Sequence, residues 1–270
     1  MALELDLSNR VVAITGGTSG IGLRTAELLL EAGASVAICG RDKNRLLTAL
    51  NTLGETSAAQ TQLKDRVQGR VCDVLDVNAV REWRHAITSE FGRVDFLICN
   101  AGQGRVSTFA STDDDAWRRE FELKLFSVVH PVRTFHADLK VAPEAAIVCV
   151  NSLLARQPEP HMVATSSARA AISNLVRSLA VEFAEDNIRV NSILLGLVDS
   201  GQWRRRFEAA ETDQSYAEWC AALAAKKNIP LGRLGHTEEA AKAIVFMISP
   251  WSSYVTGTAL DVSGGVARGV

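Results

Sequence analysis

The stretch that decides the fold is residues 11–22, VVAITGGTSGIG, where a short apolar run leads into a glycine-rich turn and then into a helical pattern. Gly16, Gly20 and Gly22 have the spacing G-x-x-x-G-x-G. Such a turn needs glycine where the chain turns tightly, where the backbone approaches a pyrophosphate, and where the helix packs closely on the strand. The free N–H groups and the dipole at the helix start favour a phosphate. The stretch therefore predicts a dinucleotide-binding strand–turn–helix; the alternative is a glycine-rich turn without a ligand.

The rest of the chain alternates short apolar runs with longer amphipathic stretches such as 21–33 and 77–92. This alternation predicts βαβ crossovers and a parallel sheet covered by helices on both faces. We expect a single α/β domain, doubly wound around a seven-stranded parallel sheet, with ligands beyond the carboxyl ends of the strands. The predicted strands are residues 10–15, 34–39, 70–72, 94–99, 145–150, 188–193 and 258–262.

The composition excludes several classes of protein. The 270 residues are 47% hydrophobic, and 29 Lys and Arg are balanced by 31 Asp and Glu, so no strongly basic nucleic-acid surface is expected. No apolar run reaches the roughly 18 residues of a membrane span, and the first ten residues lack a signal pattern. The five cysteines form no CxxC or CxxH pair, and four lie at or near the ends of predicted strands. We therefore expect a cytoplasmic chain without disulfides or a metal site.

One segment, residues 200–228, departs from the alternation. Its aromatic residues have helical spacing, which predicts a pair of amphipathic helices near the carboxyl edge of the sheet. The pair is interpreted as a substrate lid or as ordinary surface packing. Arg204, Arg205 and Arg206 at its start either meet an anionic substrate or form a solvated face, which is the more frequent meaning of such a run.

Four motifs together resemble the short-chain dehydrogenase/reductase family: TGGTSGIG, CDV (72–74), CNAG (99–102) and the C-terminal stretch 232–265. The resemblance covers essentially the whole chain. It implies a Rossmann fold, a homodimer or homotetramer, a nicotinamide dinucleotide cofactor and a small-molecule carbonyl or alcohol substrate. Asp73 and Asn100 also have plain interpretations as turn or cap residues. The cofactor contacts that the resemblance implies are Gly16, Thr18, Ser19, Gly20, Ile21, Gly22, Asp73, Val74, Asn100, Ala101, Gly102, Gly196, Val198 and Ser200.

The end of the second predicted strand, Cys39-Gly40-Arg41-Asp42, favours NADP(H) over NAD(H). An NAD site needs a carboxylate that accepts from the ribose 2′-hydroxyl, and Gly40 stands where NAD-preferring relatives tend to carry Asp. The guanidinium of Arg41 can pair with a 2′-phosphate. Asp42 is interpreted as a helix cap, with a ribose contact as the alternative.

The resemblance fails at the catalytic positions. The family pattern has Ser, then Tyr thirteen residues later, then Lys four after that, with an Asn on the preceding long helix. This chain has Ser152, Thr165, Arg169 and Lys124 at those positions. A threonine hydroxyl has too high a pKa to supply a proton unaided. Arginine stays protonated, so it does not relay protons as lysine does, although Arg169 can still hold the ribose.

Two residues are candidates for the missing proton donor. Lys124 would be tuned by partial burial and by the charge of Arg169, and His161 carries an imidazole, the side chain used most often for proton transfer near neutral pH. Their plain interpretations are a solvated helix lysine and a surface-loop histidine. The leading hypothesis is an NADP(H)-dependent oxidoreductase in which Ser152 orients the substrate oxygen, Thr165 adds a hydrogen bond and Arg169 stabilises negative charge. The alternative is a catalytically degenerate NADP(H)-binding, scaffold or sensor protein.

Overall fold

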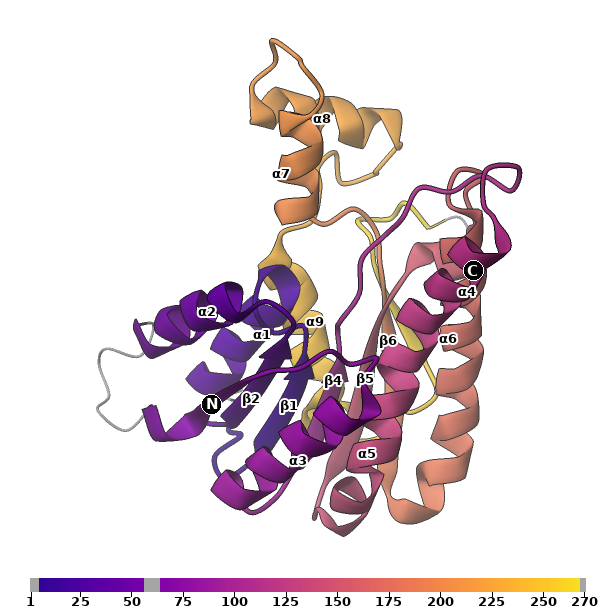
Figure 1. The fold of residues 1–270 in the computed structure, drawn as a ribbon. Helices are drawn as coiled ribbons and strands as arrows, with labels where there is room; N and C mark the ends of the chain where they lie inside the picture. The colour runs from indigo at the N-terminus through magenta and orange to yellow at the C-terminus, as the bar shows by residue number, and fades with distance from the viewer. Residues whose placement is uncertain (1–4, 56–63, 268–270) are drawn as a thin grey trace.

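The computed structural model describes residues 5–55 and 64–267, which form a seven-stranded parallel sheet in the order β3-β2-β1-β4-β5-β6-β7 (Figure 1). The seven-stranded parallel sheet predicted from the alternation is therefore confirmed. The third strand starts earlier than predicted and ends before Cys72, because its apolar signal is weak at an edge strand. The strands are β1 (Val11–Thr15), β2 (Ser35–Gly40), β3 (Val67–Val71), β4 (Phe96–Cys99), β5 (Ala145–Ser152), β6 (Ile188–Leu195) and β7 (Ala259–Val262).

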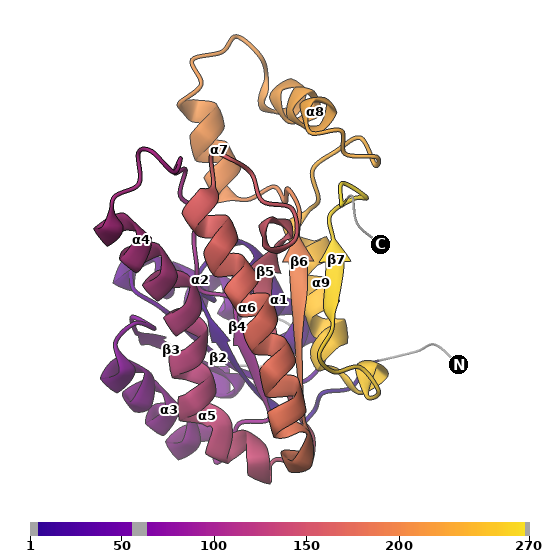
Figure 2. The same cartoon turned by 90° about the vertical axis from the view of Figure 1, so that its right-hand side faces the viewer.

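Helices cover both faces of the sheet (Figure 2). One face is packed by α1 (Gly20–Glu31), α2 (Lys43–Glu55) and α9 (Thr237–Ile248). The other is packed by α3 (Val77–Phe91), α5 (Ser127–Val141) and α6 (Val163–Glu182). In β1, Val11 and Ala13 face the second group, whereas Val12 and Ile14 face the first, as the period of two in a strand requires.

The chain order reverses at β1, which lies between β2 and β4. In a doubly wound sheet this reversal opens a crevice beyond the carboxyl ends of the strands, where ligands bind. The turn after β1 leads into α1, and the turn after β4 lies beside it. These two turns therefore form the first part of the site.

A wide helical turn interrupts the long helix that follows β4. Helix α4 (Asp114–Phe121) passes into the π-helical turn η2 (Glu122–Phe126) and then into α5. Such turns are rare and are frequently found at functional sites. This turn contains Lys124, whose side chain is only 2% exposed. The interpretation of Lys124 as a solvated helix lysine is therefore wrong.

The departing segment forms the predicted pair of helices, α7 (Gly201–Glu208) and α8 (Tyr216–Lys226), above the carboxyl edge of the sheet (Figures 1 and 2). The pair is held together by its own aromatic contacts. Phe207 makes edge contacts with Tyr216 and Trp219 at ring separations of 5.3 and 5.8 Å. The ring centroids of Trp203 and Trp219 lie 6.2 Å apart. The helices thus pack mainly on each other and only partly on the sheet.

Four of the five cysteines are buried in the sheet region and all five are free, as expected from their positions. Across residues 5–55 and 64–267, we find no helix with both the length and the apolarity that a membrane span requires.

Candidate active site

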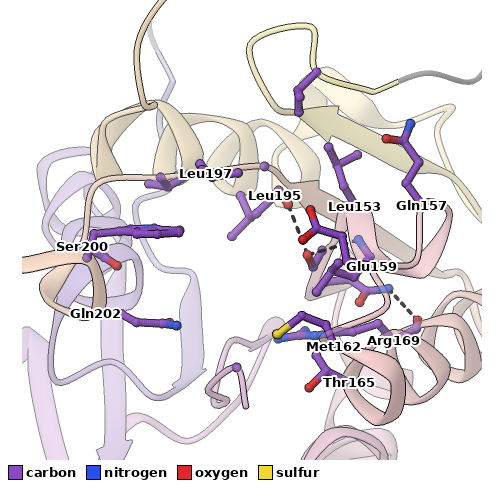
Figure 3. A pocket seen from close by; sticks show the side chains of 18 of the residues that line it. Leu153, Gln157, Glu159, Met162, Thr165, Arg169, Leu195, Leu197, Ser200 and Gln202 are labelled. Atoms are coloured by element: carbon purple, nitrogen blue, oxygen red, sulfur yellow. Dashed lines mark hydrogen bonds between the residues drawn. The ribbon is translucent and has the colours of Figure 1, made fainter. Parts of the chain in front are cut away.

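A cavity of about 800 Å³ lies at the carboxyl edge of the sheet (Figure 3). Its walls come from the turns after β1 and β4, the ends of β5 and β6, the start of α6, and the α7–α8 segment. Figure 3 shows Thr165 and Arg169 at the start of α6, across from Ser200 and Gln202. The predicted site residues that line this cavity are Ile21, Asn100, Gly102, Ser152, His161, Thr165, Arg169, Gly196, Val198 and Ser200.

The glycine turn after β1 is fixed by close backbone contacts. Gly16 and Gly20 have left-handed φ values of 65° and 56°, which non-glycine residues adopt only under strain. A Cβ on Gly22 would lie 2.4 Å from the carbonyl oxygen of Gly16. The side-chain amide of Asn100 donates to the carbonyl oxygens of Thr15 (3.2 Å) and Gly16 (2.9 Å). Asn100 therefore acts on the turn itself, as a positioning residue.

The same turn leaves room for a phosphate. A Cβ built on Gly20 would meet nothing within 4 Å, so the backbone at the start of α1 borders open space. Ser19 caps α1, but its side chain makes no capping hydrogen bond. The hydroxyl of Thr15 accepts from the backbone N–H groups of Asn100 and Ala101, both at 3.0 Å, which joins this turn to the one after β4. The geometry matches a dinucleotide-binding turn.

The end of β2 combines a crowded glycine with an exposed arginine. A Cβ on Gly40 would lie 2.7 Å from Cγ2 of Thr18, so Thr18 occupies the space where an acidic side chain would start. The side chain of Arg41 is 62% exposed, and its Nη1 lies 4.0 Å from Oδ2 of Asp73. Asp42 accepts from the N–H groups of Asn44 (2.9 Å) and Arg45 (3.0 Å), which confirms its interpretation as a helix cap.

Asp73 and Val74 follow β3 near Arg41. The Oδ1 atom of Asp73 accepts from the N–H of Leu75 at 3.0 Å, so this carboxylate also stabilises a turn, as its plain interpretation predicted. Val74 is buried. The turn interpretation and a cofactor contact are compatible, because Oδ2 of Asp73 is left to face Arg41.

Ser152 ends β5 at the cavity wall. Its Oγ lies 3.4 Å from the carbonyl oxygen of Leu195 and accepts from the N–H of Leu154 at 3.3 Å. Both contacts are long, so the hydroxyl retains capacity for a substrate oxygen. The strand end that presents Ser152 is thus positioned by β6 on one side and by its own following turn on the other.

Thr165 makes hydrogen bonds within the protein that the sequence did not predict. Its hydroxyl donates to Oε1 of the buried Glu120 and lies 3.2 Å from the carbonyl oxygen of Arg105. Thr165 is 1% and Glu120 is 4% exposed. Thr165 borders the cavity, but its hydroxyl belongs to a buried polar cluster in this structure.

Glu120 connects Thr165 to Lys124. The Nζ atom of Lys124 lies 2.9 Å from Oε1 of Glu120 and also donates to the carbonyl oxygen of Gln103. Lys124 does not itself line the cavity. Sequence reasoning missed Glu120, although its position four residues before Lys124 is the spacing at which opposite charges meet on a helix. Its burial was the missing signal, because a lone sequence does not show which face of this helix packs against α6.

Arg169 lies one helical turn after Thr165. Its Nη1 donates to the carbonyl oxygen of Val150 at 2.9 Å, and its buried Nε has no hydrogen-bond partner in the described chain. Burial lowers the pKa of Arg169 to about 10, so the guanidinium stays cationic at neutral pH. Burial also lowers the pKa of Lys124, and the charge of Arg169 lowers it further, while Glu120 acts in the opposite direction.

Two further titratable candidates lie outside this cluster. The side chain of His161 is 53% exposed at the cavity rim, with Nε2 3.0 Å from Oε2 of Glu159. The hydroxyl of Tyr216 donates to Asp199, and burial together with this bond raises its pKa. Tyr216 therefore remains protonated and is directed away from the cavity, so it does not replace the missing tyrosine.

The fold and the glycine turn define a Rossmann-type protein, and comparison with known proteins gives its family and activity class. The family model described as enoyl-(acyl carrier protein) reductase matches residues 16–267. The 3-oxoacyl-(acyl-carrier-protein) reductase of Chlamydia trachomatis is 30% identical over 261 residues, which are 97% of this chain and 98% of that protein. The chain therefore belongs to the short-chain dehydrogenase/reductase family and is an oxidoreductase of that family.

Solved structures of relatives agree closely. A short-chain oxidoreductase from Pseudomonas aeruginosa PAO1, described as containing an atypical catalytic center, is 57% identical with a TM-score of 0.94, covering 98% of this chain and 100% of that one. An NADPH-bound structure with the same description is 57% identical, has a TM-score of 0.92 and covers 98% and 99%. The L-sorbose reductase of Gluconobacter frateurii, complexed with NADPH and L-sorbose, is 28% identical with a TM-score of 0.92, covering 99% and 100%.

Proposed function

We propose that this protein uses NADP(H) to transfer hydride between the nicotinamide and a carbonyl or alcohol substrate in the cavity. The observation on which the proposal depends is the buried contact of Glu120 with both Thr165 and Lys124 beside this cavity. It supplies a proton donor in a site that lacks the usual tyrosine. NADPH-bound relatives at 57% and 28% identity support the choice of cofactor.

The residues present fit a bound NADP(H). The open backbone at Gly20, the free side chain of Ser19 and the start of α1 suit the pyrophosphate. Arg41 suits the 2′-phosphate, with Thr18 excluding a carboxylate at residue 40. Arg169 and Asn151 line the cavity, and each has a buried polar atom, Nε and Oδ1, without a hydrogen-bond partner in the described residues, so both residues suit ribose hydroxyls. The other proposed contacts are Gly16, Ile21, Gly22, Asp73, Val74, Asn100, Ala101, Gly102, Gly196, Val198 and Ser200.

In the reduction direction the cofactor supplies the hydride, and the protein supplies the proton. Ser152 donates to the substrate oxygen and orients it. Arg169 stabilises the negative charge that develops on this oxygen. The hydroxyl of Thr165 gives its proton to the oxygen and takes one through Glu120 from Nζ of Lys124, which ends neutral. The high pKa of Thr165 is then no obstacle, because the hydroxyl passes a proton on and never persists as an alkoxide.

The low exposure of Lys124 explains how it is prepared for this role. Burial and the nearby guanidinium both favour its neutral form, so the proton leaves more readily than from a solvated lysine. His161 is the other donor considered. Its pairing with Glu159 at the rim makes it the weaker candidate, and the experiment below separates the two.

The test combines cofactor titration with turnover. Calorimetry is expected to show tighter binding of NADPH than of NADH. Reduction is then assayed with 3-oxoacyl thioesters and L-sorbose, the compounds named for the relatives described above. The variant Glu120→Gln/Lys124→Met removes both buried charges together and should lower turnover by roughly 10²- to 10⁴-fold. His161→Ala is the matched comparison and should leave turnover unchanged.

The outcomes have distinct meanings. Absence of binding by either cofactor would contradict the proposal as a whole. Tight NADPH binding with no turnover of any substrate would favour the degenerate cofactor-binding protein. Loss of activity in His161→Ala, with the double variant unaffected, would transfer the proton role to His161.

We also propose that the α7–α8 segment, residues 200–228, acts as the substrate lid. Gln202, Trp203, Arg206, Lys226 and Lys227 from this segment line the cavity, which supports the role. The family resemblance further leads us to propose a homodimer or homotetramer in the cytoplasm, where five free cysteines stay reduced. Light scattering on the purified protein measures the assembly.

A further inference from the structure

The cavity wall is strongly cationic. Four basic side chains line it, namely those of Arg169, Arg206, Lys226 and Lys227, whereas Glu159 is the only carboxylate among the described lining residues. Glu159 is already neutralised, because Nζ of Lys227 lies 2.8 and 3.0 Å from its two oxygens and His161 lies 3.0 Å away. The lining therefore has an excess of positive charge that no lining carboxylate offsets.

Among the lining cations that have no carboxylate partner in the described residues, Arg206 is held in place by a contact with an aromatic ring. Its side chain is half-buried on α7, and its guanidinium lies 4.6 Å from the ring centroid of Trp203, which also lines the cavity. Stacking on an aromatic face holds the guanidinium in place and leaves its N–H groups free at the edge. Within residues 5–55 and 64–267 no carboxylate pairs with Arg206, and none pairs with Lys226.

The neighbouring arginines show that this placement is specific. Arg204 is exposed and lies over the ring of Tyr216 at 4.5 Å, but it does not line the cavity, and neither does Arg205. Helix α7 therefore places the three consecutive arginines differently: Arg204 and Arg205 are exposed away from the cavity, and Arg206 lines it. The solvated-face interpretation holds for the first two and fails for Arg206.

We propose that the substrate bears an anionic group, most simply a carboxylate, which Arg206 binds with the help of Lys226 while the carbonyl reaches Ser152. Beside these cations the lining contains both polar side chains, such as Gln157 and Asn228, and apolar ones, such as Leu153, Met162 and Leu197. The substrate class is therefore a keto or hydroxy acid. This inference rests on the proposed function, because it names the substrate of the same site.

The cofactor does not account for these cations. Its phosphates are assigned to the glycine turn, Ser200 and Arg41, all at the level of the sheet edge. Arg206 lies six residues after Ser200, which is about 9 Å further along an α-helix, and α7 rises away from the sheet (Figure 2). A guanidinium at that height meets the part of the ligand that enters under α7 and α8.

The experiment uses paired probes of the same skeleton: levulinate, 4-oxocyclohexanecarboxylate and benzoylformate, each with its methyl ester. Binding to the full protein is measured by calorimetry, with and without NADPH, and turnover by NADPH oxidation. We expect at least one acid to bind roughly tenfold or more tightly than its ester, as a charge-assisted contact provides. Added salt should weaken binding of that acid and leave the ester unaffected.

Arg206→Gln is the test variant, and Arg204→Gln on the same helix is its matched control. Arg206→Gln should reduce binding and kcat/KM for the acid by about ten- to hundredfold, with the NADPH affinity unchanged. Arg204→Gln should change neither. The proposal is overturned if no acid binds, if acids and esters bind equally, or if both variants have the same effect. Failure of NADPH to bind would instead contradict the proposed function, since acid binding is also measured without cofactor.

Discussion

Two regions border the same cavity: the glycine turn of residues 15–22, and the wall beside Ser152, Thr165 and Arg169, which we call the catalytic wall. The first depends on backbone groups and the second on side chains. The turn is fixed through its backbone: the side-chain amide of Asn100 donates to the carbonyl oxygens of Thr15 and Gly16, and none of these groups titrates. The wall is built from side chains, with Glu120, Lys124 and Arg169 buried or half-buried beside Thr165. The turn has no room for a side chain at Gly22, while the wall holds three interacting charges.

The difference shows where this chain has kept the family pattern and where it has left it. A backbone site has no substitute for glycine, because a Cβ at Gly22 would overlap the carbonyl oxygen of Gly16. A site made of side chains can change its residues, provided that each buried charge keeps a partner of opposite charge. Lys124 in place of an amide is accompanied by Glu120 at 2.9 Å, so the buried cation has a partner. The predictions below test these two regions, from the largest expected effect to the smallest.

Breaking the buried ion pair should have the largest effect. Lys124→Met leaves the carboxylate of Glu120 buried without a cation, which we expect to cost about 3–5 kcal/mol of unfolding free energy. The double variant Glu120→Gln/Lys124→Met removes both charges and should recover most of that loss. Chemical denaturation of the three proteins measures it. Equal stability of the single and double variants would show that the two charges do not interact.

A side chain at Gly22 in the glycine turn should strongly weaken cofactor binding. In Gly22→Ala the new Cβ would lie 2.4 Å from the carbonyl oxygen of Gly16, so the turn must shift. We expect NADPH affinity to fall roughly hundredfold, equivalent to about 3 kcal/mol. Gly54→Ala in α2 is the control, because a Cβ there meets nothing within 4 Å, and it should leave affinity intact. Calorimetric titration decides, and unchanged affinity in Gly22→Ala would contradict the backbone role.

Arg41 should determine cofactor choice without affecting the turn. Arg41→Ala removes the proposed partner of the 2′-phosphate, and we expect about ten- to hundredfold weaker NADPH binding. NADH lacks that phosphate, so its affinity should stay the same. A parallel loss for both cofactors would mean that Arg41 acts on the fold and not on the phosphate.

The pH dependence should report Lys124. Burial and Arg169 lower its pKa below the ordinary value of 10.5. Reduction requires protonated Lys124, so the rate of reduction should fall about tenfold per pH unit above the lowered pKa. Oxidation requires neutral Lys124, so the rate of oxidation should rise over the same pH range. The double variant should lose the alkaline limb of the rate profile; a limb that persists would belong to another group.

The same shift affects stability. The unfolded chain binds this proton more tightly than the folded chain, so the free energy of unfolding should rise with pH between the lowered and the ordinary pKa of Lys124.

Removing the ion pair between Lys227, at the end of α8, and Glu159 should have the smallest effect. Both side chains of this pair are partly exposed, Lys227 by 30% and Glu159 by 37%, and Lys227→Ala breaks it. Such a pair contributes about 0.2–1 kcal/mol, so KM for the substrate should rise by up to about fivefold with kcat unchanged. Lys242→Ala removes a comparable pair with Glu238 on α9, far from the site in the chain, and serves as the control. Equal kinetics for the two variants would argue against a lid function.

Much of the fold was predictable because its signals are local. Seven strands, the α1 and α3 helices and the paired helices of residues 200–228 all follow from apolar periodicity and glycine placement. The cap formed by Asp42 was predictable for the same reason, since it depends on N–H groups two and three residues away. The third strand was misplaced at its ends, because an exposed edge strand with the sequence VQGRV has little apolar pattern.

The catalytic wall was only half predictable. Ser152, Thr165, Arg169 and Lys124 were found by position, but the orientation of the Thr165 hydroxyl and the presence of Glu120 were not. Both depend on α4 and the η2 turn packing against α6, more than forty residues away in the chain. The same is true of Arg206, which only the course of α7 separates from Arg204 and Arg205.

The sequence by itself determined the sheet, the glycine turn and the loss of the usual tyrosine and lysine, because each depends on residue type and on neighbours close in the chain. Tertiary structure alone decided which charges are buried together and which arginine faces the cavity. The physical reason is that a charge acts through distance and desolvation, and these are fixed when remote segments pack.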